Sequence, residues 1–131
     1  MTKFVDLRSD TVTRPGTAMR KAMSEAVVGD DVLGEDPTIV RLEETAAEMF
    51  NMESGLFVAS GTQGNLLALF SHCQRGDEYI AGQTAHNYLE EGGGGAILAS
   101  IQPQPVANEL DGTLPLDQIK ALIKPDDFHY A

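Results

Sequence analysis

The chain has 131 residues and a formal net charge of −11, from 9 Lys and Arg against 20 Asp and Glu. Its length suits one domain, and 42% hydrophobic residues are enough for a packed core. The acidic balance argues against partners such as nucleic acid or an anionic membrane surface, because both need clustered Lys and Arg. The single cysteine, Cys73, excludes an internal disulfide. Since the sequence shows no signal peptide and no apolar run long enough for a membrane span, we expect a soluble, cytoplasmic protein.

The first part of the chain predicts an arm followed by two helices. Residues 6–14 show no helical period and end at Pro15, which predicts an extended or looped arm. Residues 17–26 favour a short helix. Asp36 before Pro37 indicates a second helix, because Asp caps free amides and Pro suits the first helical position. The apolar residues that continue this helix keep its spacing: Ile39, Leu42, Ala46, Met49 and Phe50.

Strands and helices alternate in the rest of the chain. Residues 54–60 predict a short buried strand, and residues 61–70 predict a helix that opens with two glycines. A second strand is expected at 78–81, and an extended stretch at 101–106, where two prolines forbid a regular helix. The remaining predictions are turns at 74–77 and 110–113, helices at 85–91 and 115–124, a helix or a strand at 93–100, and the start of a strand at 127–131. This order predicts an α/β fold with a mainly parallel sheet flanked by helices.

The strongest local signal is the run Ser60-Gly61-Thr62-Gln63-Gly64-Asn65, between a predicted strand and a predicted helix. A helix N-terminus leaves backbone amides unpaired, and its dipole is positive there. Gly61 and Gly64 would let a ligand approach the backbone, and Thr62 adds a hydroxyl, which suits a phosphate monoester or a carboxylate. The run lacks the lysine of a P-loop and does not fit the dinucleotide fingerprint. An ordinary glycine-rich turn is the other interpretation, and the spacing leaves both open.

A second signal is His86, which follows the strand predicted at 78–81. In an open parallel sheet ligands bind beyond the carboxyl ends of strands, so His86 would share that edge with Gly61 and Thr62. A histidine there can stack on an aromatic ring or move a proton near neutral pH, or it only hydrogen-bonds the backbone at a helix start. His86 and Glu90, four residues apart, could offer two metal ligands. No third ligand is evident, so we expect no metal.

Three other features have mainly structural interpretations. The arm at 6–15 is rich in hydrogen-bonding side chains, which form either a substrate-contacting loop or a network of caps and ion pairs. The acidic run at 29–37 does not fit the calcium-loop pattern, and a capped loop is expected. Cys73 is expected to be a buried thiol.

The motifs of the chain stand in the order of one known family. They are Asp-Leu-Arg-Ser-Asp-Thr-Val-Thr-Arg-Pro at 6–15, Gly-Asp-Asp-Val-Leu-Gly-Glu-Asp-Pro-Thr at 29–38, Gly-Thr-Gln-Gly-Asn at 61–65, Ala-His-Asn-Tyr at 85–88 and Asp-Gly-Thr-Leu-Pro at 111–115. Together they closely resemble the N-terminal portion of the low-specificity L-threonine aldolases. Those are pyridoxal-phosphate enzymes with the aspartate-aminotransferase-like fold, fold type I. The resemblance implies an N-terminal arm at 1–15 and, at 16–131, the first part of the large cofactor-binding domain.

The resemblance also implies a cofactor, pyridoxal 5'-phosphate, and a set of site residues. Gly61, Thr62 and Gln63 match the loop that holds the cofactor phosphate. His86 matches the histidine that stacks on the pyridine ring and is proposed to take part in proton transfer. Ser9 matches an arm serine that contacts the substrate carboxylate.

The implied reaction is retro-aldol cleavage of L-threonine or L-allo-threonine to glycine and acetaldehyde, with the cofactor as electron sink. It belongs to threonine breakdown and glycine synthesis. The implied substrate is a small β-hydroxy-α-amino acid, and the implied assembly is a homodimer or homotetramer.

Two departures and one absence bear on this resemblance. Leu33 stands where relatives often have a tyrosine, and Glu90 where some have an aromatic residue, so substrate choice could differ. A Schiff-base enzyme needs a lysine. None of the chain's lysines lies in the small-residue strand-end context of the family's lysine: Lys3, Lys21, Lys120 and Lys124. We therefore expect residues 1–131 by themselves to be inactive.

Two other functions stay open. One is a pyridoxal-phosphate-dependent lyase or racemase acting on other β-hydroxy amino acids, which Leu33 and Glu90 would favour. The other is a non-catalytic phosphate-binding module, which the helix start at Gly61-Thr62 and the missing lysine would favour.

Overall fold

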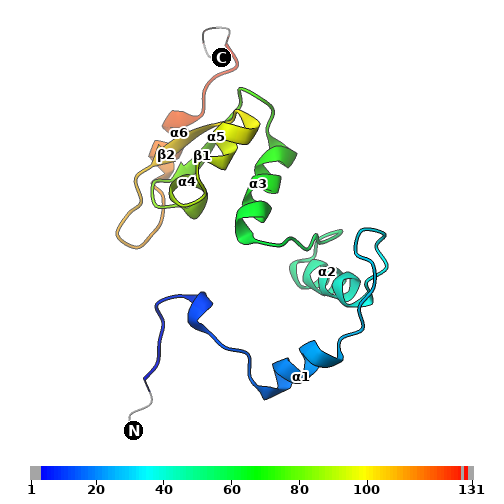
Figure 1. The fold of residues 1–131 in the computed structure, drawn as a ribbon. Coiled ribbons are helices and arrows are strands. Elements are labelled where there is room, and N and C mark those ends of the chain that lie inside the picture. Colours follow the sequence, from blue (N-terminus) through cyan, green and yellow to red (C-terminus); the bar gives the residue numbers. More distant parts are fainter. Residues whose placement is uncertain (1–3, 128, 130–131) are drawn as a thin grey trace. The chain divides into compact units, whose positions relative to one another are not determined.

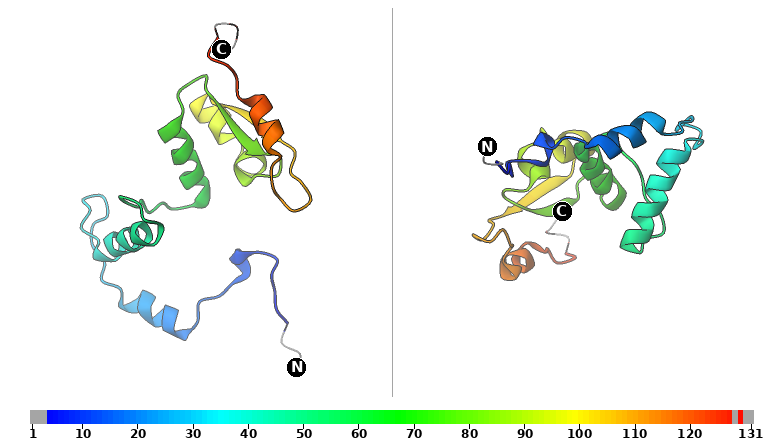
Figure 2. Two further views of the ribbon diagram at one scale, coloured as in Figure 1. Left: turned by 180° about the vertical axis from the view of Figure 1, so that it is seen from behind. Right: turned by 90° about the horizontal axis from the view of Figure 1, so that it is seen from below.

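A computed structural model describes residues 4–127 and residue 129 (Figures 1 and 2). It divides into two compact units, Met1–Phe57 and Val58–Ala131, which are described separately below. Among the described residues, no helix has both the length and the apolar character needed to cross a bilayer.

In its described part, residues 4–57, the first unit contains a short 3-10 helix and two α-helices. The 3-10 helix, η1 (Asp10–Val12), lies within the arm that the sequence predicts as extended or looped. The two α-helices, α1 (Thr17–Glu25) and α2 (Pro37–Phe50), confirm the helices predicted there. The hydroxyl of Ser9 accepts a hydrogen bond from the amide of Thr11 at 3.2 Å, which caps η1.

Asp36 determines where α2 begins and closes the loop before it. Its Oδ1 accepts hydrogen bonds from the amides of Thr38 and Ile39, each at 2.9 Å. Its Oδ2 accepts a hydrogen bond from the amide of Gly29 at 2.9 Å. Asp36 is only 6% exposed, so these hydrogen bonds replace those that water would make to its carboxylate. The hydrogen bond from Gly29, with those from Ile39 and Thr38, holds the pKa of the Asp36 carboxyl below its usual value. The capped loop predicted for residues 29–37 is therefore confirmed.

The second unit is an α/β arrangement around two parallel strands (Figure 1). Its elements in chain order are α3 (Gly61–His72), β1 (Glu78–Gly82), α4 (His86–Leu89), α5 (Gly94–Ala99), β2 (Gln102–Val106) and α6 (Leu116–Leu122). Glu78 pairs with Gln102 and Gly82 with Val106, and α4 and α5 lie in the connection between the strands. The predicted α/β fold with a parallel sheet flanked by helices is confirmed.

The core of this unit lies between the sheet and α5. Its buried apolar residues are Ala81, Ala99, Ile101 and Val106. A Cβ added at Gly95 would lie 3.0 Å from Cδ1 of Leu69 on α3 and 3.5 Å from Cε1 of Tyr79 on β1. Glycine at this position therefore lets α5 approach both elements closely. Residues 93–100, which the sequence leaves between helix and strand, form a helix that packs here.

The strand predicted at 54–60 is wrong. These described residues form no strand, and Phe57 is 51% exposed. Their backbone donors bind side chains instead of a neighbouring strand: the amide of Phe57 donates to Glu43 at 2.6 Å, and that of Ala59 to Gln63 at 3.0 Å. A strand exists only by pairing with another, and among the described residues this segment has no such partner.

Two smaller expectations concern Cys73 and the last residues. Cys73, expected to be buried, is only partly buried at the end of α3. The strand predicted at 127–131 lies largely outside the described residues. His129, which is described, lies in a turn and donates its amide to Oδ1 of Asp127 at 2.9 Å.

Candidate functional site

The start of α3 carries an arrangement of backbone donors that fits an anion. The hydroxyl of Ser60 accepts from the amide of Gln63 at 3.1 Å, and Oε1 of Gln63 accepts from the amide of Ala59 at 3.0 Å. The amides of Gly61 and Thr62 belong to the first turn, where an α-helix offers them no carbonyl. Together with the positive end of the helix dipole, these two amides can hold a negatively charged oxygen.

The space around these donors is open. A Cβ added at Gly61 would meet no atom within 4 Å, and both Gly61 and Thr62 are exposed. Two amides and the Thr62 hydroxyl form a donor set that fits a phosphate monoester. The cap already uses the amide and the side-chain carbonyl of Gln63, so the side-chain amino group is the donor that Gln63 could still offer.

His86 begins α4, after the loop that leaves the carboxyl end of β1. Its Nδ1 lies 2.8 Å from Oε1 of Glu91. The same Oε1 accepts a hydrogen bond from Nδ2 of Asn65 on α3 at 2.6 Å. The side chain of Glu91 is 5% exposed, whereas that of His86 is 67% exposed. Glu91 thus connects the histidine to the helix whose first turn holds the candidate anion donors.

The ionisation of the Glu91 carboxyl determines which nitrogen of the His86 ring carries a proton. Burial raises its pKa, but hydrogen bonds from His86 and Asn65 outweigh that effect, and the pKa lies below its usual value. An ionised carboxylate only accepts hydrogen bonds, so Nδ1 of His86 carries a proton in this contact. In the neutral ring the free lone pair then belongs to Nε2.

The loop that carries His86 is held by Asn108, which follows β2. Its Oδ1 accepts a hydrogen bond from the amide of Thr84, and its Nδ2 donates to the carbonyl of Gly112 at 3.2 Å. A Cβ added at Gly82 would lie 2.8 Å from Nδ2 of Asn108, so this close approach requires glycine. The loops after the two parallel strands are thus joined at the carboxyl edge of the sheet.

Ser9 belongs to the first unit, and the structure describes its surroundings within that unit. Its hydroxyl lies 2.9 Å from Oγ1 of Thr11. Beside it, Nη2 and Nε of Arg8 donate to the two oxygens of Asp6 at 2.6 and 2.9 Å. The arm therefore forms the network of caps and ion pairs that its composition left open, and the substrate contact of Ser9 stays a prediction.

The sequence interpretation assigned no role of their own to three residues near the candidate site: Asn65, Glu91 and Asn108. A spacing of four residues pointed from His86 to Glu90, but the structure pairs the histidine with Glu91, because α4 ends at Leu89 and the chain turns. Within residues 4–127 and 129, no group of three His, Cys, Asp or Glu side chains is placed to hold a metal.

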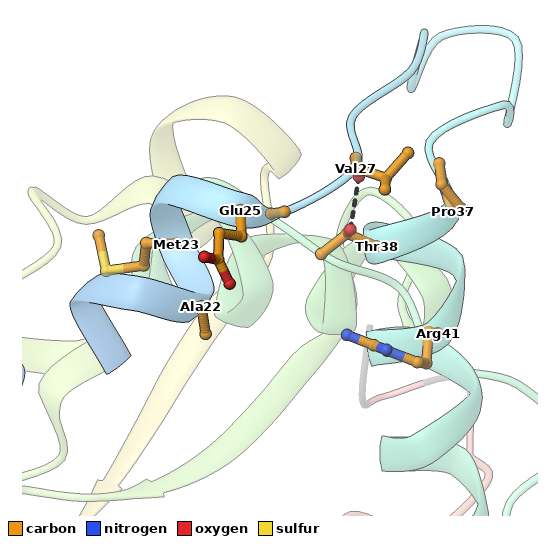
Figure 3. Close-up of a pocket in the computed structure, with 8 residues that line it drawn as sticks. Ala22, Met23, Glu25, Val27, Pro37, Thr38 and Arg41 are labelled. Carbon is orange, nitrogen blue, oxygen red and sulfur yellow. Dashed lines mark hydrogen bonds between the residues drawn. The ribbon is translucent and has the colours of Figure 1, made fainter. Parts of the chain in front are cut away.

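A hollow in the first unit lies apart from these residues in the sequence. It is lined mainly by apolar atoms of α1, α2 and the segment after α1 (Figure 3). The hydroxyl of Thr38 donates to the carbonyl of Val27 at 2.6 Å beside it, and Glu25 and Arg41 supply its charged groups. None of the site residues predicted from the sequence lines this hollow.

Comparison with known proteins decides the family. Residues 6–131 match the family described as beta-eliminating lyase. The chain belongs to the beta-eliminating lyase family. The fold of this chain is accordingly that of fold type I, as its motifs predict.

Several relatives of this chain carry the name low-specificity L-threonine aldolase. The low specificity L-threonine aldolase of Escherichia coli (strain K12) is 61% identical over 128 residues, a match that covers 98% of this chain and 38% of that relative. Low-specificity L-threonine aldolase 1 of Arabidopsis thaliana is 53% identical over 123 residues, or 93% of this chain and 34% of the relative. The Saccharomyces cerevisiae low specificity L-threonine aldolase is 42% identical, over 93% of this chain and 32% of the relative. The resemblance read from the motifs is confirmed, and the chain spans about a third of the length of these relatives.

Proposed function

We propose that the whole protein containing these residues cleaves L-threonine and L-allo-threonine to glycine and acetaldehyde with bound pyridoxal 5'-phosphate. The observation that carries this proposal is the similarity to threonine aldolases across nearly the whole chain. The donor set at the start of α3 supports the cofactor, because it fits a phosphate monoester. When bound, the cofactor supplies an electron sink for the pair released as Cα–Cβ breaks.

The residues of this chain would bind and orient the cofactor and the substrate. The amides of Gly61 and Thr62 and the Thr62 hydroxyl would hold the phosphate, and the amino group of Gln63 could add a donor. The ring of His86 would stack on the pyridine, and its Nε2 would offer the lone pair needed to accept the β-hydroxyl proton. Ser9 donates a hydrogen bond to the substrate carboxylate. In cleavage the β-hydroxyl proton leaves oxygen, Cα–Cβ breaks, the aldehyde C=O forms and a proton is added at Cα, so that threonine balances glycine plus acetaldehyde.

A direct assay tests this proposal. The protein expressed from its complete coding sequence is incubated with pyridoxal phosphate and either L-threonine or L-allo-threonine. Acetaldehyde is then measured through NADH oxidation by alcohol dehydrogenase. We expect stoichiometric acetaldehyde and glycine, and a loss of about 10²- to 10⁴-fold in kcat for His86→Asn, the usual contribution of general acid–base catalysis. His72→Asn, at the far end of α3, is the matched control.

The same assay separates the other functions. Turnover of L-serine or phenylserine without turnover of threonine would favour a lyase or racemase for other β-hydroxy amino acids, to which Leu33 and Glu90 would contribute. Cofactor binding without any turnover would favour a non-catalytic phosphate-binding module.

The proposal extends to assembly and location. We propose a homodimer or homotetramer in the cytoplasm, acting on a small β-hydroxy-α-amino acid in threonine breakdown and glycine synthesis. Sedimentation equilibrium of the whole protein and fractionation of its cells check these two points, and a monomer would contradict the first.

A further inference from the structure

In the contact between His86 and Glu91, the two side chains differ strongly in their exposure to solvent. The carboxylate is almost entirely buried, at 5% exposure, while the imidazole is 67% exposed. One oxygen, Oε1, accepts from both Nδ1 of His86 at 2.8 Å and Nδ2 of Asn65 at 2.6 Å. Asn65 therefore fixes the buried carboxylate of Glu91, and this carboxylate in turn fixes the exposed ring of His86.

The backbone explains how Glu91 reaches this position. Helix α4 ends at Leu89, and Gly92 and Gly93 adopt positive φ values of 63° and 69°. Such left-handed backbone is favourable for glycine and reverses the chain. The reversal places Glu91 between α4 and α3 instead of on the exposed face of a continued helix.

We propose that Glu91 is a positioning residue for His86, fixing the orientation and tautomer of the ring, and that Asn65 holds Glu91 in place. This inference deepens the proposed function, on which its catalytic meaning rests. The ring is kept with its proton on Nδ1, and the lone pair of Nε2 faces away from the carboxylate. Because Asn65 stands three residues after Thr62 on α3, the same helix sets both the phosphate donors and the ring.

The test measures the tautomer directly. The whole protein with ¹⁵N-labelled histidine is studied by solid-state NMR near neutral pH, with and without pyridoxal phosphate, and His86→Asn assigns the signal. Ring nitrogen shifts distinguish a proton on Nδ1 from one on Nε2. The variants are Glu91→Ala, Glu91→Gln and Asn65→Ala. The control, Glu109→Gln, removes an exposed charge from the same unit.

We expect the Nδ1–H form in the wild type and loss of that preference in Glu91→Ala. Glu91→Gln, which keeps an acceptor oxygen, should retain part of it, and Asn65→Ala should show a smaller change in the same direction. For cleavage we expect kcat to fall about 10- to 100-fold in Glu91→Ala, less than full loss of acid–base catalysis, with KM little changed. The visible circular dichroism of bound cofactor should change in the same variants and not in Glu109→Gln.

The outcomes distinguish a failure of the role given to Glu91 from a failure of the proposed function. An unchanged Nδ1–H signal in Glu91→Ala and Glu91→Gln, in folded protein by far-ultraviolet circular dichroism, overturns the positioning role even if cleavage is seen. A wild type that binds no pyridoxal phosphate overturns the proposed function, while the ring shifts still decide the role of Glu91. If Glu91→Ala does not fold, the shift in Glu91→Gln decides alone.

Discussion

The side-chain carbonyl of Asn108 accepts two hydrogen bonds from Thr84, one from its amide at 3.0 Å and one from its hydroxyl at 2.8 Å. Thr84 lies in the loop between β1 and His86, and Asn108 lies in the loop after β2. The side chain of Asn108 thus connects the two loops at the carboxyl edge of the parallel sheet. The position of His86 depends on this contact as well as on Glu91.

Asn108→Ala should loosen this edge. Losing three hydrogen bonds worth about 0.5–1.5 kcal/mol each predicts a fall of roughly 1.5–4.5 kcal/mol in the free energy of unfolding. Asn108→Asp keeps the acceptor oxygen and loses only the donor to Gly112, so its loss should be smaller. Urea unfolding of the whole protein compares the two variants. Equal stability of Asn108→Ala and the wild type would contradict the role given to this contact.

Thr62→Ala should weaken cofactor binding. A hydrogen bond to a charged group is worth about 1.5–3 kcal/mol, which predicts a rise of ~10- to 100-fold in the Kd for pyridoxal phosphate. Thr62→Ser should restore most of the affinity. Thr45→Ala is the control, because the hydroxyl of Thr45 bonds the carbonyl of Arg41 within its own helix. Fluorescence titration of the apoprotein measures all three, and an unchanged Kd in Thr62→Ala would remove its hydroxyl from the site.

Asp36 should make the first unit sensitive to acid. The pKa of its carboxyl is lowered on folding by the hydrogen bond from Gly29 and those from Ile39 and Thr38. Its stabilisation is therefore present above the usual Asp pKa of about 3.9 and is lost as the pH falls through the lowered value. Asp36→Asn should lower Tm by several degrees at pH 7, and the difference from wild type should shrink toward pH 3. A difference that stays constant with pH would contradict this account.

Ile101 should be the most costly apolar position of the second unit to shorten. It is 1% exposed and lies between α5 and β2. Ile101→Val is expected to lower the free energy of unfolding by about 0.5–1.5 kcal/mol, and Ile101→Ala by about 2–5 kcal/mol. Ile123→Ala, at a side chain 64% exposed, should change it little. Denaturant curves of the three variants give the comparison, and equal losses at both positions would argue against this core.

Residues 1–131 alone should release no acetaldehyde from L-threonine. Nζ of Lys124 lies 2.6 Å from Oε1 of Glu78, at the amino end of β1, whereas His86 follows the carboxyl end. A strand of five residues spans roughly 13–17 Å, so this lysine is held at the opposite end of the sheet. Incubation with pyridoxal phosphate and coupled detection of acetaldehyde checks this. Release at the rate of the whole protein would show that a lysine of this chain suffices.

Much of the local structure could be predicted because its causes are local. Asp36 before Pro37 marks the start of α2, and Ser60 caps α3 through the amide of Gln63, both contacts between near neighbours in the chain. The strand predicted at 54–60 failed because a strand depends on a partner far along the chain. Residues 93–100 stayed undecided for a related reason, since their helix is stabilised by packing at Gly95 against α3 and β1.

By itself, then, the sequence determined the α/β order and the family, and it predicted an anion-binding helix start at Gly61 and Thr62. Short-range capping and the order of the motifs contain that information. Only the tertiary structure decided that His86 pairs with Glu91, that Asn65 shares the same carboxylate oxygen, and that Asn108 joins the two loops. These contacts link residues 5, 26 and 24 positions apart, and no helical or strand period relates such positions, so only the folded backbone brings them together.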